Sequence, residues 1–204
     1  MKQNFKISLQ QYGMAVLLGT MLLGTSNGTM AKSPANPNKV LRYAFPVAET
    51  GFDPAAVQDL YSAHVLYSIF DTLYTYDYLA SPAKLVPNAA AALPEVSADG
   101  LTYTIHLKKG IYFSPDPVFK GKPRELTAAD YAYSFKRLLD PQLHSPSSWL
   151  FEGRIAGMDS AIQQANKTGK FNYDQSIAGL QTPDRYTLVI RLTEPNHNFP
   201  MLLA

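Results

Sequence analysis

The sequence contains no cysteine among its 204 residues. Disulfide bridges and thiolate chemistry are therefore excluded, and no cysteine is present to accept a lipid anchor. The four histidines are scattered, and no two of them are separated by three or four residues; they are His64, His106, His144 and His197. Because that spacing is what helical zinc sites use, we expect no metal site and no cofactor, and we expect His106 to be a surface group.

Motifs for catalysis are also missing. No G-x-S-x-G elbow occurs, and neither Ser114 nor Ser134 has a recognisable base nearby in the sequence. No glycine-rich strand-to-helix junction is present to bind phosphate. Loop carboxylates such as Asp116 and Glu125 are expected to be solvated rather than paired. The sequence therefore predicts that the protein is not an enzyme, and a small exported hydrolase with an unrecognised acid pair is the alternative.

The longest hydrophobic run is short and lies near the start of the chain. Lys2 and Lys6 precede an apolar run over residues 14–23, and small and polar residues follow as far as Ala31. This order predicts a secretory signal peptide over residues 1–31 that is cleaved after Ala31. A transmembrane anchor is the alternative, but the run is well short of the ~20 residues that span a bilayer.

The chain that remains after this cleavage has no net charge. Removing residues 1–31 removes two lysines and no acidic residue, which leaves 16 basic and 16 acidic side chains. The mature chain therefore lacks the net positive charge that would attract nucleic acids and anionic lipids, and no nucleic-acid partner is expected. Residues 32–39 are polar and rich in proline, so they are predicted to be flexible.

One stretch, residues 99–141, combines several secondary-structure signals. Asp99-Gly100 predicts a turn, and residues 101–107 alternate apolar with polar side chains, as a half-buried strand does. After a basic turn, residues 111–113 are predicted to be its partner strand.

The same stretch ends in a helix. Thr127 is predicted to be its N-cap, with Asp130 complementing the helix dipole. Tyr131, Phe135 and Leu138 then form an apolar face. The helix is predicted to end before Asp140-Pro141, since a proline disfavours helical geometry in the residue before it.

Other elements follow from the same patterns. Residues 85–93 are compatible with a short helix or an extended crossing. Residues 186–192 are expected to pair with residues 101–107. Strands joined by turns, with helices between them, predict an α+β domain with a largely antiparallel sheet. The remaining predicted elements are strands over residues 40–45 and 72–78 and helices over residues 60–70 and 155–167.

The order of motifs in residues 99–141 resembles one known family. DGLTYTIHLKKGIYF, a loop and LTAADYAYSFKRLLDP are similar to a segment of the bacterial extracellular solute-binding proteins of family 5, the peptide, dipeptide and nickel receptors of ABC importers. Residues 41–54, 68–77, 85–97 and 182–195 resemble further segments of the family in the same order. The resemblance covers nearly the whole chain after residue 39.

This resemblance implies a periplasmic-binding-protein-like type II fold, in which two lobes close on a ligand and a small extra domain is inserted after the first strand. Residues 40–71 would be the first part of the ligand-binding lobe, and residues 72–204 the inserted accessory domain. Family members are considerably longer, so we expect the chain to be the N-terminal portion of such a protein. A truncated product without function is the alternative.

The resemblance also implies the function: a soluble periplasmic substrate-binding component, monomeric and not a lipoprotein, that delivers peptides to an ABC permease in the inner membrane. A nickel chelate, an opine or a sugar is the alternative solute. The aromatic content of 12% suits recognition of peptides or sugars in a cleft.

Five residues are candidates for ligand contact. By the family's pattern, the residues before the IFDTL segment border the cleft, and they are Asp59, Leu60, Tyr61 and Ser62. Their backbone could bind an extended peptide as an added strand. Trp149 is the fifth candidate, because an exposed indole ring in a serine-rich loop is costly without a partner.

Overall fold

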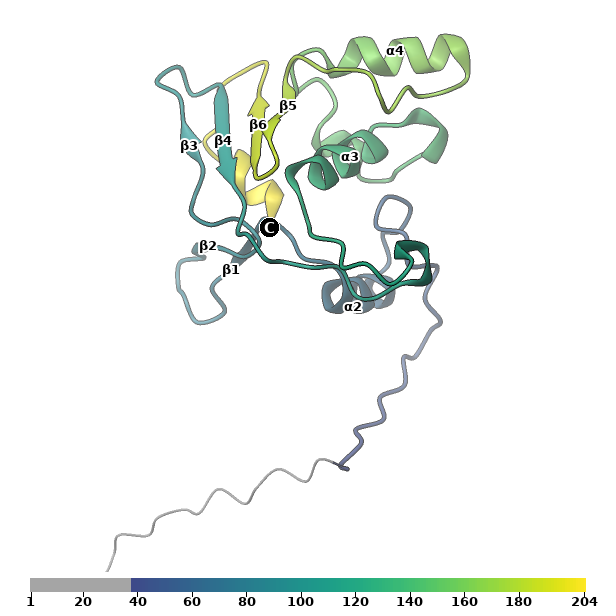
Figure 1. The fold of residues 1–204 in the computed structure, drawn as a ribbon. Coiled ribbons are helices and arrows are strands. Elements are labelled where there is room, and N and C mark those ends of the chain that lie inside the picture. The colour runs from purple at the N-terminus through teal and green to yellow at the C-terminus, as the bar shows by residue number, and fades with distance from the viewer. Residues whose placement is uncertain (1–37) are drawn as a thin grey trace, which may run out of the picture. The chain divides into compact units, whose positions relative to one another are not determined.

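Four antiparallel strands form the main sheet in this computed structural model, which describes residues 38–204 (Figure 1). The signal peptide predicted over residues 1–31 lies outside the described residues, and so does most of the predicted segment 32–39. The strands lie in the order β3, β4, β6, β5, with bounds Glu95–Val96, Thr102–His106, Thr187–Arg191 and Leu180–Asp184.

The two central strands have the burial pattern that the sequence predicts. In β4, Tyr103 and Ile105 are buried while His106 is exposed. β4 pairs antiparallel with β6 along all five residues of each strand. The predicted alternation over residues 101–107 and its pairing with residues 186–192 are therefore confirmed.

The prediction of a partner strand over residues 111–113 is wrong. Both edges of β4 are already occupied, because β3 pairs with one edge and β6 with the other. Tyr112 instead forms an isolated antiparallel bridge with Glu125. The chain leaves the sheet after β4, where the backbone N–H of Lys108 donates to the carbonyl oxygen of Ala89 over 2.9 Å.

Helix α3, Ala128–Leu138, lies beside β5 in Figure 1 and begins where the sequence predicts. The Asp130 carboxylate accepts hydrogen bonds from the backbone N–H of Thr127 at 2.8 Å and from the Thr127 hydroxyl at 2.9 Å. These bonds fix the first turn, since they satisfy donors that have no partner within the helix. Phe135 is buried on the inner face, and the helix ends before Asp140-Pro141 as predicted.

The other two helices are α2, Leu60–Ile69, and α4, Met158–Thr168. Helix α4 begins three residues later than predicted, because Ile155 forms a bridge with Leu192 and holds the chain beside the sheet. It ends at Thr168, one residue after the predicted end, and its C-cap Gly169 has a φ of +71°, a backbone conformation that glycine adopts without strain.

Strands β1, Tyr74–Tyr76, and β2, Leu85–Pro87, form a separate two-stranded antiparallel sheet. The strand predicted over residues 72–78 is therefore present but shorter. Residues 85–93 adopt the extended alternative rather than the helix. Four short 3-10 helices complete the secondary structure of residues 38–204, with bounds Pro117–Phe119, Pro141–Leu143, Ser148–Leu150 and Phe199–Leu203.

The strand predicted over residues 40–45 is not found. Residues 40–44 have no regular secondary structure, and Leu41 is 91% exposed. An isolated strand is not stable without a neighbour to receive its hydrogen bonds, and both sheets of the described chain are built without this segment.

The core lies where the main sheet meets α3, α4 and the C-terminal 3-10 helix. Residues 45–204 form one compact unit, and the α+β class with antiparallel sheets is confirmed. Within residues 38–204, every helix falls short of the length and hydrophobicity that crossing a bilayer requires. The largest fully buried side chains are Tyr74, Tyr103, Ile105, Ile155, Met158, Phe171, Leu188, Ile190 and Phe199.

Candidate functional site

The four predicted ligand residues, Asp59 to Ser62, form the start of α2. Asp59 is the N-cap: its carboxylate accepts hydrogen bonds from the backbone N–H groups of Tyr61 at 3.0 Å and Ser62 at 2.8 Å. The hydroxyl of Thr50 donates to the same carboxylate over 2.5 Å. Hydrogen bonds from Ser62 and Thr50 hold the pKa of Asp59 far below its usual range, so this carboxylate is ionised in the folded chain.

Ser62 is fully buried, and its hydroxyl oxygen accepts hydrogen bonds from the backbone N–H groups of Thr50 at 3.0 Å and Gly51 at 3.4 Å. The side chains of Asp59 and Ser62 therefore bind a preceding loop of the chain to the first turn of α2. A helix N-cap before an apolar run is a recognised sequence signal, and it could have identified this role of Asp59.

The added-strand mode of binding does not fit these residues. Leu60, Tyr61 and Ser62 are helical, and the N–H groups of Tyr61 and Ser62 already donate to Asp59. Contact of the four residues with a ligand stays a prediction. The side chain best placed for contact is that of Leu60, which is exposed, while Tyr61 is half-buried against the ring of Phe45, with 5.1 Å between centroids.

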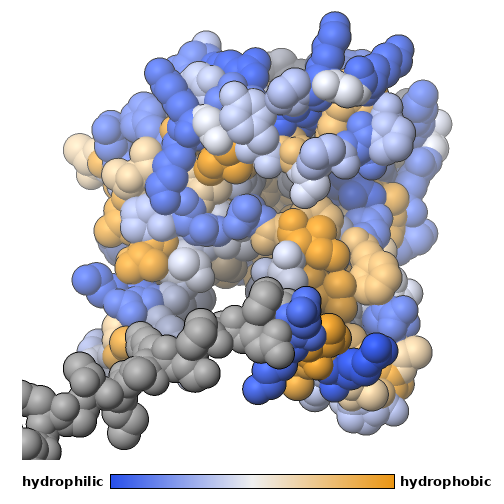
Figure 2. All heavy atoms as spheres, turned by 60° about the horizontal axis from the view of Figure 1, so that its bottom comes forward, coloured by the Kyte–Doolittle hydropathy of each residue, from blue (hydrophilic) through white to orange (hydrophobic). Residues whose placement is uncertain are grey.

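Helix α2 carries an uncovered apolar surface. Figure 2 brings the bottom of Figure 1 forward and shows hydrophobic residues gathered on the face where α2 lies. A helix at the surface of a globular protein usually turns polar side chains to the water, and a contiguous apolar surface of this kind marks a contact site. Its exposed large apolar side chains are Leu60, Tyr67, Ile69 and Phe70, the last being the C-cap residue.

An ion pair joins the turn before α2 to α3. The guanidinium of Arg137 donates two hydrogen bonds, of 2.9 and 2.7 Å, to the two carboxylate oxygens of Asp53. The hydrogen bond from Arg137 lowers the pKa of Asp53, and the same bond raises the pKa of Arg137. The side chain of Asp53 is 40% exposed and that of Arg137 is 28% exposed, so water weakens the attraction between their charges.

We expect Asp53→Asn to lower the free energy of unfolding at neutral pH by about 1 kcal/mol, the scale of a partly exposed bidentate pair. The pKa of Asp53 is lower in the folded than in the unfolded chain. Its contribution is therefore present above about pH 4 and is lost as the pH falls through the folded-state pKa. Urea denaturation at a series of pH values measures the difference in free energy of unfolding between the parent and Asp53→Asn, which should shrink under acid conditions.

Glu152→Gln is the control, because Glu152 is exposed. An equal loss of free energy of unfolding in Glu152→Gln would contradict the role of the ion pair.

The fifth predicted residue, Trp149, lies in the 3-10 helix Ser148–Leu150 and is 60% exposed. It is on a different element from residues 59–62, and none of the hydrogen bonds and ring contacts found in residues 38–204 joins the two. The structure thus brings the first four candidates together at the start of α2 and places Trp149 on another element.

Glu125 corrects the expectation that the loop carboxylates are solvated. Its carboxylate accepts hydrogen bonds from the backbone N–H of Gly110 at 2.8 Å, from the Tyr186 hydroxyl at 3.0 Å and from Arg185 at 3.1 Å. These donors lower its pKa, and the bond from Gly110 has the largest effect. Asp116 is also engaged, since it accepts from the backbone N–H of Val118 at 2.8 Å.

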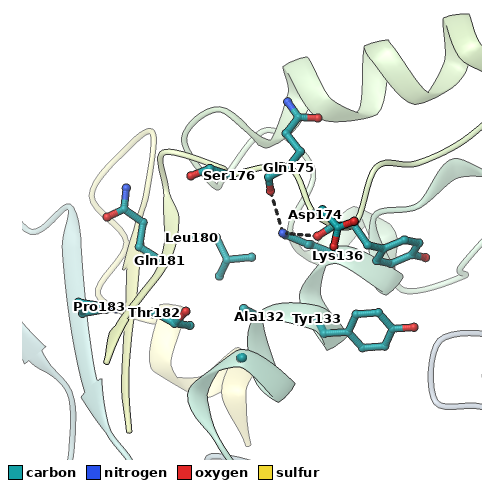
Figure 3. A pocket seen from close by; sticks show the side chains of 12 residues that line it. Ala132, Tyr133, Lys136, Asp174, Gln175, Ser176, Leu180, Gln181, Thr182 and Pro183 are labelled. Atoms are coloured by element: carbon teal, nitrogen blue, oxygen red, sulfur yellow. Dashed lines mark hydrogen bonds between the residues drawn. The ribbon is translucent and has the colours of Figure 1, made fainter. Parts of the chain in front are cut away.

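A pocket of about 560 Å³ lies between α3, the loop over residues 173–176 and β5 (Figure 3), and none of its lining residues was predicted from the sequence as a site residue. Lys136 reaches it from α3, and its ammonium donates to the carbonyl oxygens of Tyr173 at 2.7 Å and Gln175 at 2.8 Å. Within residues 38–204 no group of three histidine, aspartate or glutamate side chains could hold a metal ion. His106 is exposed as predicted, with its Nδ1 atom 3.2 Å from the Thr187 hydroxyl.

The family model described as "Bacterial extracellular solute-binding proteins, family 5 Middle" matches residues 84–204. Di/tripeptide-binding protein 2 of Pseudomonas aeruginosa is 37% identical over 114 residues, which are 51% of this chain and 19% of that protein. The dipeptide-binding protein of Lactococcus lactis is 29% identical over 172 residues, which are 84% of this chain and 28% of that protein.

A solved structure is similar as well. The pheromone receptor PrgZ, solved for its structure and mode of peptide binding, matches with a TM-score of 0.59 at 29% identity, over 76% of this chain and 27% of the receptor. The chain thus spans less than a third of the length of each of these similar proteins.

Proposed function

The chain belongs to the bacterial extracellular solute-binding proteins of family 5, and from this premise we propose that it is part of a peptide-binding component of an ABC importer. One observation carries the proposal: the family match over residues 84–204 coincides with relatives named as di-, tri- and oligopeptide-binding proteins. The fold agrees with this, since the chain is a small α+β part of the type II periplasmic-binding-protein fold.

The domain boundaries form part of the proposal. Residues 40–71 are the first part of a ligand-binding lobe, and residues 72–204 are the accessory domain. The uncovered apolar face of α2 supports this division, because such a surface suits packing against the rest of a lobe. The ion pair between Asp53 and Arg137 then connects the first lobe segment to the accessory domain.

The mechanism is binding without catalysis. Two lobes close around a peptide, and the closed form delivers it to a permease in the inner membrane. The protein acts as a monomer in the periplasm, which it reaches through the signal peptide over residues 1–31. Names of relatives, such as the periplasmic oligopeptide-binding protein of Haemophilus influenzae, support the compartment and the solute.

Calorimetry tests this proposal. The protein purified from its native host is titrated with a mixture of dipeptides, tripeptides and longer peptides, and saturable heat is expected. No heat with peptides together with a response to a nickel chelate would overturn the peptide assignment. Catalytic turnover of any peptide during the titration would contradict the absence of enzymatic activity.

Two exposed side chains test the proposed contact residues. Leu60→Ala and Trp149→Ala should weaken peptide binding while leaving the folded chain intact, because neither side chain is needed in the core. Asp59 and Ser62 are less informative positions, since each also holds the loop before α2. The exposed Val118, changed to alanine, is the control, and equal affinities in all three variants would exclude both contacts.

A further inference from the structure

The pocket in Figure 3 is separate from the residues proposed to contact peptide. Its walls come from α3, β5 and the loop over residues 173–176, and none of its lining residues precedes Ala129. Its volume of about 560 Å³ lies within the range of small-molecule sites. A ligand here would therefore occupy the accessory domain and not the cleft.

The positive charge in this pocket has only neutral direct partners. Two of the three N–H donors of the Lys136 ammonium are used by the carbonyl oxygens of Tyr173 and Gln175. Within residues 38–204, no carboxylate forms a direct ion pair with this ammonium. Lys136 is half-buried, and this burial lowers the pKa of its ammonium. A cation in this state can accept an anionic partner from solution.

A negative charge lines the same pocket. Asp174 is exposed and lines the pocket with Lys136; its charge offsets part of the lowering of the Lys136 pKa, and the two side chains form no direct ion pair. Figure 3 shows both side chains on the same side of the pocket, with Asp174 contributed by the loop and Lys136 by α3. A charge of each sign is thus available at one site.

The rest of the pocket suits a small polar molecule. Leu180, which is buried, and Ala132 provide apolar surface, while Gln181 and Thr182 present groups that can form hydrogen bonds (Figure 3). Strand β5 is an outer strand of the sheet, but its pairing is irregular between Gln181 and Asp184 and it contains Pro183. Irregular pairing and proline both oppose the addition of a further strand. The size of the pocket and the irregular pairing of the outer strand β5 together favour a small molecule over an extended peptide chain.

We propose that this pocket is a second binding site that takes a small zwitterion, whose carboxylate binds the Lys136 ammonium and whose own ammonium lies against Asp174. The apolar surface of Ala132 and Leu180 contacts the part of the ligand between its two charges. This site goes beyond the proposed peptide cleft and does not depend on it.

The test is a titration of the isotope-labelled chain followed by nuclear magnetic resonance of the backbone amides. Three probes are compared: glycylglycine, N-acetylglycylglycine, which lacks the ammonium, and glycylglycinamide, which lacks the carboxylate. Glycylglycine should give saturable shifts at Gln175, Ser176 and Gln181, and each blocked probe should bind more weakly. Lys136→Met should weaken glycylglycine binding about tenfold, as expected for loss of a charged hydrogen bond.

Matched variants separate binding from folding. Asp174→Asn should weaken glycylglycine but not N-acetylglycylglycine, which has no ammonium to lose. Ala132→Phe fills the pocket without removing Lys136 and should abolish the shifts, which keeps the test valid if Lys136→Met loosens the loop. Lys167→Met, on the exposed face of α4, is the charge-matched control and should bind as the parent does.

Two outcomes would overturn the second site. One is the absence of saturable shifts at the three pocket amides with 20 mM glycylglycine, a concentration about twentyfold above a weak, millimolar dissociation constant. The other is binding that persists unchanged in Ala132→Phe. Shifts confined to Tyr61 and Ser62 would place the peptide in the proposed cleft alone, so failure of the second site and failure of the proposed function are distinguishable.

Discussion

A Gly179→Ala variant is expected to lose about 3 kcal/mol or more of its free energy of unfolding, because the added methyl group has no room. A Cβ atom on Gly179 would lie 2.6 Å from three backbone atoms: the nitrogen and oxygen of Ala156 and the oxygen of Arg191. Backbone atoms cannot rotate aside as a flexible side chain can. The chain would have to move at a point where three segments meet.

Hydrogen bonds make that movement costly. Gly179 donates to the carbonyl oxygen of Ala156 over 2.8 Å and accepts from the N–H of Arg191 over 2.9 Å, while Ala156 donates to the oxygen of Arg191 over 2.9 Å. A shift large enough to admit a methyl group would stretch all three bonds.

Urea denaturation followed by circular dichroism measures this loss. Gly51→Ala is the control, because its Cβ atom would meet only Val57 at an ordinary 3.6 Å, and its effect should stay within about 0.5 kcal/mol. Equal urea unfolding midpoints for Gly179→Ala and Gly51→Ala would show that the backbone near Gly179 moves to admit the methyl group at little cost. That result would contradict close packing at this point.

Phe199→Ala should cost about 3–5 kcal/mol, the range for removing a buried aromatic ring. Phe199 is fully buried and packs against Tyr103 of β4, with 5.1 Å between ring centroids, and against Phe151 at 6.3 Å. The hydroxyl of Tyr103 donates to the carbonyl oxygen of Asn196 over 2.6 Å. Loss of the ring therefore leaves a cavity between the sheet and the C-terminal 3-10 helix and weakens the attachment of that helix.

The neighbouring Met201 offers a matched control. It belongs to the same 3-10 helix, but its side chain is 46% exposed, so Met201→Ala should change the unfolding midpoint little. Thermal unfolding and urea denaturation should agree for both variants. If Phe199→Ala unfolds at the same urea concentration as Met201→Ala, the last residues of the chain do not belong to the cooperative core.

Local elements were predictable because their signals lie within a few residues. The alternation in residues 101–107 places Tyr103 and Ile105 inside, and Thr127 with Asp130 begins α3 at the expected residue. Residues 40–45 are apolar apart from Arg42 and nevertheless form no strand, because an apolar segment also needs a neighbouring strand to pair with.

Parts of the candidate site were less accessible from the sequence. The positions of Asp59 to Ser62 came from family resemblance, and their helical geometry, which rules out an added strand, came from the structure. Glu125 was expected to be solvated, although two of its donors are Gly110 and Tyr186, at separations of 15 and 61 residues. No local pattern encodes partners at such distances.

The sequence by itself determined the paired strands over residues 101–107 and 186–192, the Thr127 cap of α3 and the membership of a solute-binding family, since these depend on spacing and on ordered motifs. Only the tertiary structure decided that β3 rather than residues 111–113 pairs with β4, that Arg137 holds Asp53, and that Lys136 lines a pocket. The physical reason is that these features depend on which distant segments pack together, and packing is a property of the whole folded chain.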